Sequence, residues 1–202
     1  MTTASRIGFR AAAGTVAVGV LYAVAVGLGI AQAGFDRPIL DPVLWIMEVL
    51  TLMSAVLILI LLAAIHALAS PERNVFSAIA LCCGAAFAAL TGAVHFVALT
   101  AGRQAGFTVL EWPSTLYAVE LLAWDIFLGL ALLFAAPVFT GTARRTRIRW
   151  MLSITGGLCM AGAIGPIVGD MAVQRIGIVG YGVLLPVTCV LLALLFRKDS
   201  HG

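Results

Sequence analysis

Charged side chains are scarce in this sequence. Only 10% of its 202 residues are charged and 62% are hydrophobic, whereas soluble domains carry about 25% charged residues. So few charged groups cannot cover the surface of a soluble globule, and the solvent around most of the chain must therefore be lipid. The net charge of +3 comes from arginines near the predicted membrane edges, and it does not indicate nucleic-acid binding.

Motifs that define common metal and cofactor sites are missing as well. The four cysteines (Cys82, Cys83, Cys159 and Cys189) form no CxxC or Cys/His pattern, so neither a disulfide framework nor a zinc finger is expected. No HExxH pair occurs. The only lysine, Lys198, lies in the C-terminal tail, which excludes a retinal protein because that cofactor needs an intramembrane lysine. We therefore predict no metal and no cofactor.

Long apolar runs are what the sequence does contain. About 20 apolar residues cross a bilayer core, and six segments reach that length: residues 9–32, 43–69, 76–100, 116–138, 150–170 and 176–196. The breaks between them hold Pro, Gly and charged residues, which end helices. The first run extends past Ile30 without a clear cleavage site, so it reads as a retained span rather than a signal peptide. We predict an all-α membrane protein, a single domain that forms a bundle of six transmembrane helices.

Basic residues are unevenly shared between the two ends of the predicted bundle. With six spans both termini lie on one side, and that side carries Arg6, Arg10, Arg73, Arg144, Arg145, Arg147, Arg149, Arg197 and Lys198. The other side carries only Arg37, Arg103 and Arg175. Cytoplasmic loops are rich in Lys and Arg. We therefore predict a protein of the inner or plasma membrane with both termini in the cytoplasm.

Ionisable residues within the spans concentrate in the predicted outer half. At about 1.5 Å per residue, Glu48, His95 and Glu120 lie at similar depths and Asp125 lies a turn or more deeper. Such residues usually face the bundle interior and mark a functional site. We predict an outward-opening pocket lined by these four residues and Trp124. Candidate substrate-binding residues around it are Trp45, Trp112, Tyr117, Trp124, Asp170 and Tyr181.

Several of these residues also have a purely structural interpretation. Asp170 and Arg175 would form an interfacial salt bridge that closes a tight hairpin. Trp45, Trp112 and Tyr117 would be anchors of the aromatic belt at the membrane interface. Small residues add a packing prediction, because Gly19, Ala23 and Gly27 recur every fourth position and favour close contact between helices.

The acids and the histidine raise a question of geometry. Glu120 and Asp125 are five residues apart, which places them about 140° apart around a helix axis. They are therefore not expected to act as a matched pair, and Asp125 is our candidate for the residue that faces the cavity. His95 has Thr91 one turn back as a possible hydrogen-bond partner.

Three familiar chemistries fit poorly. His66 and His95 differ in depth by about 20 Å across a core of about 30 Å, too far to bind one haem between them. A zinc site would have only His95 at the level of the acids. A Ser/His/Asp hydrolase would need a positioned serine, and nothing marks Ser114 as a nucleophile.

Acid–base chemistry in an apolar, aromatic-lined cavity remains. A buried carboxylic acid can keep its proton near neutral pH and donate it, and aromatic faces stabilise positive charge on a substrate. This favours an enzyme that protonates a lipophilic, possibly isoprenoid, substrate, with Asp125 or Glu48 as the donor and His95 as the orienting or relaying group. The alternative is a proton-coupled transporter or binding protein for a small lipophilic or weakly acidic solute.

The Trp45-x-x-Glu48 stretch in the second span resembles the acidic second helix of the small all-helical membrane terpene cyclases of indole- and meroterpenoid pathways. The resemblance implies a metal-independent, acid-initiated cyclisation of the isomerase or lyase type. It also implies a second acid, either Asp125 or Asp170. That family usually has seven spans, and this chain has six. More generally, the sequence is similar to small actinobacterial multi-pass membrane proteins, a likeness that implies no function.

Overall fold

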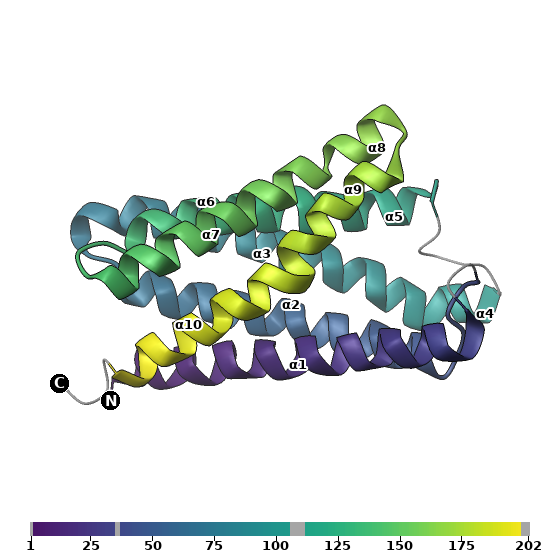
Figure 1. The fold of residues 1–202 in the computed structure, drawn as a ribbon, viewed down its shortest axis with the longest axis horizontal. Coiled ribbons are helices and arrows are strands. Elements are labelled where there is room, and N and C mark those ends of the chain that lie inside the picture. Colours follow the sequence, from purple (N-terminus) through teal and green to yellow (C-terminus); the bar gives the residue numbers. More distant parts are fainter. Residues whose placement is uncertain (1, 35–36, 106–111, 199–202) are drawn as a thin grey trace.

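The computed structural model describes residues 2–34, 37–105 and 112–198, and all regular structure within these ranges is helical. Six helices in this part of the chain are long and apolar enough to cross a membrane: Thr3–Ala33, Val43–Ala67, Pro71–Gly102, Thr115–Val138, Ala143–Val168 and Met171–Arg197. The structure thus confirms the predicted all-α bundle of six spans (Figure 1). The chain has the make-up of a multi-pass membrane protein.

The first two spans are continuous helices and the other four are interrupted. Spans one and two are α1 (Thr3–Ala33) and α2 (Val43–Ala67). The third comprises η1 (Pro71–Arg73), α3 (Asn74–Val97) and the π-helical η2 (Ala98–Gly102), and α4 (Arg103–Ala105) follows it. The fourth comprises α5 (Thr115–Leu121), the π-helical η3 (Leu122–Leu128), α6 (Gly129–Ala135) and the 3₁₀ turn η4 (Ala136–Val138). The fifth comprises α7 (Ala143–Gly162) and α8 (Ile164–Val168), and the sixth α9 (Met171–Ile178), the π-helical η5 (Val179–Leu184) and α10 (Leu185–Lys198).

Capping side chains decide where four of these helices begin. Oxygens of Thr2, Ser114, Thr142 and Asp170 accept hydrogen bonds from backbone N–H groups in the first turns of α1, α5, α7 and α9. Such caps satisfy N–H groups that have no partner within the helix. The cap at Thr142 explains why the fifth helix begins at Ala143, before the apolar run that predicted a start at residue 150.

The six spans form a closed ring of neighbours. α1 packs on α2, α2 on α3, α3 on α6, α6 on α7, and α7 on α9 and η5, while α10 returns to α1. Figure 1 shows α1 and α10 side by side near the two termini and diverging toward α9. We call the end of the bundle that carries the termini the terminal end, and the end that carries Asp41 and Asp170 the loop end.

An apolar core holds the terminal half of the ring together. Its largest fully buried side chains include Phe87, Phe139, Phe196, Ile58 and Leu152. Burying a side chain of this size away from water contributes about 1.5–3 kcal/mol. Toward the loop end this packing gives way to a cavity.

The predicted small-residue face of α1 contacts another helix at only one of its three residues. A Cβ built on Gly19 would lie 3.3 Å from the Pro186 ring of α10. A Cβ built on Gly27 would meet nothing within 4 Å, and Ala23 is exposed. The prediction of a continuous contact through these residues is therefore wrong. α1 diverges from α10 at this point, and the small residues lie beside the opening that this leaves.

Candidate functional site

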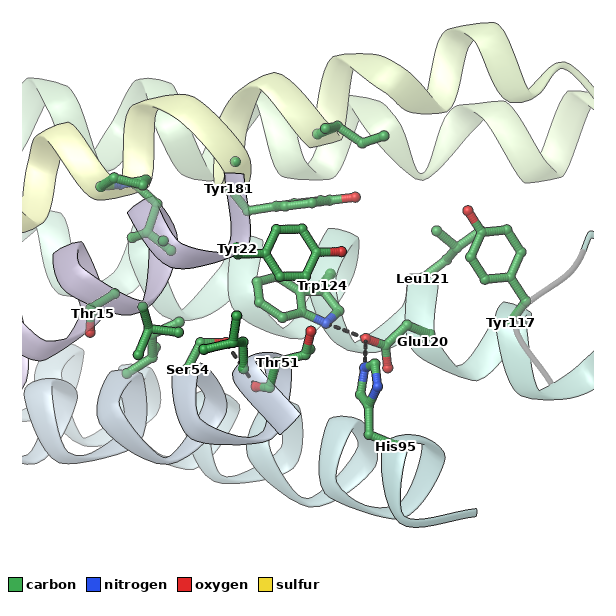
Figure 2. Close-up of a pocket in the computed structure, with 18 residues that line it drawn as sticks. Thr15, Tyr22, Thr51, Ser54, His95, Tyr117, Glu120, Leu121, Trp124 and Tyr181 are labelled. Atoms are coloured by element: carbon green, nitrogen blue, oxygen red, sulfur yellow. Dashed lines mark hydrogen bonds and ion pairs between the residues drawn. The ribbon is translucent and has the colours of Figure 1, made fainter. Parts of the chain in front are cut away.

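A cavity of about 290 Å³ lies inside the ring, and every span except the fifth contributes to its lining. The apolar part of the lining is formed by Val18, Leu50, Ile58, Leu121, Ile178 and Leu185. Hydroxyl groups of Thr15, Thr51 and Ser54 line another part, and four aromatic side chains (Tyr22, Tyr117, Trp124 and Tyr181) surround the space (Figure 2). The cavity is thus largely apolar with a few directed polar groups, as is usual for small-molecule sites.

A row of three ionisable side chains reaches the cavity through His95 and Glu120. Glu48 pairs with His95 but lies outside the lining, so the prediction that Glu48 lines the pocket is not met. His95 Nδ1 pairs with Glu48 Oε2, and His95 Nε2 lies 2.8 Å from Glu120 Oε1. The same Glu120 oxygen accepts a hydrogen bond from the Trp124 indole at 2.5 Å. His95 is 4% exposed, Glu48 6% and Glu120 8%. We call Glu48, His95 and Glu120 the carboxylate–imidazole row.

The three groups of the row come from three different spans. Glu48 lies near the start of α2, His95 near the end of α3, and Glu120 in α5. The prediction that they share one depth is matched by their direct pairing. Figure 2 shows the dashed contacts that connect His95, Glu120 and Trp124 at one side of the cavity.

The pairing limits how protons can be distributed over the row. If His95 is protonated at both nitrogens, it donates to both carboxylates and the row carries one net negative charge. If the imidazole is neutral, one carboxyl must hold the proton and donate to the ring. The row is therefore built to hold and release a proton with little rearrangement.

A π-helical segment positions the aromatic side chains of the cavity. Trp124 lies in η3, where its ring meets Phe87 edge-on at 4.9 Å and Tyr181 of η5 at 5.0 Å. Ring pairs at such distances contribute about 0.5–1.5 kcal/mol beyond their burial. π-helical turns are rare and occur frequently at functional sites. Two π-helical segments, η3 and η5, meet here. The rings of Phe87 and Tyr181 hold the Trp124 indole in the position from which it donates to Glu120.

Asp125 lies outside the lining of this cavity. Its side chain is fully buried and its Oδ2 is 3.4 Å from Gln174 Nε2, while Oδ1 has no hydrogen-bond partner among the described residues. Gly162 and Gly177 close over it from α7 and α9. The prediction that Asp125 faces the pocket is thus not met, and Glu120 is the acid of this span that does.

The side-chain amide of Gln174 connects Asp125 with the lining of the cavity. Gln174 Nε2 also donates to the hydroxyl oxygen of Tyr181 at 3.1 Å, and Tyr181 lines the cavity. Gln174 is 2% exposed. It therefore holds α9 against both Asp125 and the aromatic wall.

The remaining predicted residues lie around the loop end. Tyr117 lines the cavity and its ring meets Trp112 edge-on at 6.2 Å. Trp45 is 48% exposed and lies outside the lining. Asp170 caps α9 through the Ala172 N–H at 2.8 Å, and within the described part of the chain it forms no ion pair with Arg175. The salt-bridge interpretation of that hairpin is wrong, because capping satisfies the carboxylate instead.

Several residues of the site differ from the predictions made from the sequence. Tyr22, the only tyrosine of α1, lines the cavity without having been predicted to do so. Gln174 lies in the break predicted between residues 170 and 176, yet it is buried in α9. Thr91 is a predicted partner of His95, yet its Oγ1 has no hydrogen-bond partner among the described residues. The position of Gln174 directly before the apolar run at residues 176–196 was the sequence feature that could have placed it in the sixth span.

Neither histidine position supports a metal centre. His66 pairs with Ser77 at 2.8 Å near the terminal end, far along the bundle from His95. Within the residues that the structure describes, no group of three or more His, Cys, Asp or Glu side chains could hold a metal ion.

An ion pair joins two segments of the chain at the loop end of the bundle. The Arg103 guanidinium donates to both carboxylate oxygens of Asp41, with 2.6 Å between Nη1 and Oδ2. This hydrogen bonding from Arg103 lowers the pKa of Asp41 below its ordinary value. The pair connects the chain before α2 to the end of the third span.

Because the pKa of Asp41 is lowered in the folded state, the pair stabilises the protein above the ordinary aspartate pKa, and this contribution is lost as the pH falls through the lowered value. We expect an Arg103→Gln variant to unfold at a slightly lower temperature than the wild type at neutral pH. As the pH falls through the lowered pKa of Asp41, the two midpoints should converge. Thermal unfolding in detergent measures both, and a difference that grows in acid would contradict this assignment.

The chain matches no protein-family model, no curated protein and no solved structure. The resemblance to membrane terpene cyclases therefore stays a prediction, and the argument for function depends on the site itself.

Proposed function

We propose that this protein is an intramembrane enzyme that transfers protons to and from a small lipophilic substrate, as a terpene cyclase does. The observation that carries the proposal is the carboxylate–imidazole row at the wall of an apolar, aromatic-lined cavity. We further propose that it resides in the cell membrane with its termini in the cytoplasm, because the terminal end carries most of the basic residues. The cavity then lies in the outer half of the bilayer.

The reaction we propose begins at Glu120. Its carboxyl O–H bond breaks as a new C–H bond forms at one carbon of a substrate double bond, and the other carbon becomes a tertiary cation. A second double bond of the substrate attacks that carbon and closes a ring. Loss of a proton from the resulting cation to the row restores the acid, so the product is an isomer of the substrate and no external reagent is consumed.

The described residues supply the groups that this sequence needs. His95 holds Glu120 in place and exchanges its proton with Glu48, which keeps the row ready for a second transfer. The faces of Trp124 and Tyr181 stabilise the positive charge on the substrate. The apolar wall excludes water that would otherwise trap the cation as an alcohol.

Access from the lipid supports a membrane-dissolved substrate. The cavity lining includes Gly19 and Tyr22 of α1 and, opposite them, Ile178 and Gly182 of α9 and η5. Tyr22 is 38% exposed and Ile178 44%. The opening therefore lies between α1 and η5, on a surface that faces hydrocarbon.

The opposite end of the cavity favours an enzyme over a transporter. Leu61, Leu62 and Ile65 of α2 lie between the cavity and His66, and each is at most 4% exposed. A proton or solute path to the terminal end would need polar groups there. This apolar barrier supports a dead-end site.

Replacing Glu120 by glutamine should lower product formation about 100-fold, which is typical for loss of a general acid. The assay uses farnesol as probe with the purified protein in lipid nanodiscs made up in D₂O. The wild type should release cyclic isomers that carry one carbon-bound deuterium, detected by mass spectrometry. Glu72→Gln, a matched change at an exposed glutamate of the terminal end, should leave the rate unchanged. No product from the wild type, or equal rates for Glu120→Gln and wild type, would contradict the proposal.

A further inference from the structure

We infer that the cavity is a binding site for small lipophilic organic cations, and that such a cation takes the place of a proton on the carboxylate–imidazole row. The inference rests on the proposed function, whose site it uses, and adds the charge class of the ligand. It follows from the charges that face the cavity, from the aromatic side chains around them and from one unsatisfied carboxylate oxygen.

The charges around the cavity do not balance without an added positive charge. The row places one carboxyl group, Glu120, and the His95 imidazole at the cavity, with Glu48 paired to His95 outside the lining. No Arg or Lys occurs among the described residues that line the space, and the other titratable groups there are the hydroxyls of Tyr22 from α1, Tyr117 from α5 and Tyr181 from η5. The Arg103 guanidinium at the loop end is already paired with Asp41.

An unbalanced charge in such a place is costly. Transfer of an isolated ionised carboxylate into an apolar medium is strongly unfavourable, and the group takes up a proton or pairs with a cation instead. When the row lacks its extra proton, one negative charge remains between Glu48 and Glu120. A ligand with one positive charge can neutralise it, and a neutral or anionic ligand cannot.

The surrounding rings favour the same class of ligand. Tyr22, Tyr117, Trp124 and Tyr181 line the cavity from α1, α5, η3 and η5. The electron-rich faces of such rings attract organic cations, most strongly where water is excluded. In Figure 2 the Trp124 indole contacts Glu120, and the Tyr181 ring packs against Trp124, so that these faces are combined with a carboxylate.

One buried oxygen lacks a partner. Glu120 Oε2 has no hydrogen-bond partner among the described residues, although the residue is only 8% exposed. Unsatisfied buried acceptors are rare because burial removes the water that would otherwise bind to them. A positive charge held in the cavity next to Glu120 would compensate this acceptor electrostatically.

The test compares a cation with its uncharged isostere. Benzyltrimethylammonium and neopentylbenzene have the same shape and differ only in the charged nitrogen. Binding of each to the purified protein in nanodiscs is measured by calorimetry over a range of pH and in buffers of different ionisation enthalpy. At alkaline pH we expect the cation to bind about tenfold more tightly than neopentylbenzene. In acid the cation should lose this affinity, because protons compete with it for the row. Binding of the cation should release protons, because the coupling between proton and cation is reciprocal.

The same measurement on Glu120→Gln completes the experiment. This variant should bind neopentylbenzene like the wild type, which shows that the cavity is intact, and should lose both the preference for the cation and the proton release. Glu72→Gln should behave like the wild type throughout. Equal affinity for the two probes, or a preference that survives Glu120→Gln, would overturn the inference. Binding requires no turnover, so these outcomes are independent of whether farnesol is cyclised.

Discussion

Replacing His95 by leucine is expected to lower the free energy of unfolding by about 3–5 kcal/mol, the usual effect of removing one partner from a buried charged group. In the folded protein both ring nitrogens pair with carboxyl groups, Nδ1 with Glu48 and Nε2 with Glu120. Leucine would leave these two acids facing each other in an apolar environment without the group that separates and pairs with them. Reversible unfolding in mixed detergent micelles measures the difference.

A second histidine in the same bundle supplies the control. His66 pairs with Ser77 through one hydrogen bond of 2.8 Å and is only partly buried. His66→Leu should therefore cost about 1 kcal/mol, the net value of one neutral hydrogen bond. Equal losses for the two variants would show that His95 contributes only packing.

Apolar replacement of the whole row separates charge from volume. A triple variant that combines Glu48→Met, His95→Leu and Glu120→Met should regain part of the stability lost in His95→Leu, because no uncompensated acid remains. Recovery is incomplete because the Trp124 indole N–H loses its acceptor. A triple variant less stable than His95→Leu would mean that the acids stabilise the fold by themselves.

The six spans could be predicted from the sequence because the thickness of the membrane sets their length and composition. A helix that crosses hydrocarbon needs about 20 apolar residues, and all six runs meet it. The common depth of Glu48, His95 and Glu120 could be predicted for the same reason, since depth follows from residue number along a helix. The direct pairing of the three side chains bears out that estimate.

Rotation about the helix axes could not be predicted in the same way. The sequence indicated that Glu120 and Asp125 point in different directions but not which of them faces the cavity. That depends on how the fourth span packs against its neighbours and on the π-helical η3, whose wider turn changes the angle between residues. Asp170, a preferred N-cap residue, is the sequence signal for α9 beginning at Met171. The apolar run alone predicts a later start at residue 176, which leaves the buried Gln174 in the break before it.

The contact between α7 and α9 depends on two glycines that leave room for Asp125. A Cβ on Gly162 would lie 2.7 Å from Cα and 2.8 Å from N of Gly177, and 3.1 Å from Asp125 Oδ1. Contacts this short with backbone atoms cannot be relieved by a change of rotamer. Any side chain at Gly162 must therefore push the two helices apart.

Gly162→Ala is accordingly expected to lower the free energy of unfolding by about 3 kcal/mol, the upper part of the range for overpacking. It should also weaken the proposed proton-transfer activity, because α9 carries Gln174, which donates a hydrogen bond to Tyr181 at the cavity. The unfolding free energy in detergent and the farnesol assay measure the two effects.

Gly157 lies in the same helix and provides the matched comparison. It is exposed, and a Cβ placed on it meets nothing within 4 Å. Alanine favours helix over glycine by about 1 kcal/mol, so Gly157→Ala should be neutral or stabilising. If Gly162→Ala were also neutral or stabilising, α7 and α9 could separate without a loss in the free energy of unfolding. The burial of the Asp125 carboxyl would then not depend on the close approach of these two helices. The opposite signs expected for two glycines in one helix therefore test whether this helix contact, rather than helix propensity, holds Asp125 away from the cavity.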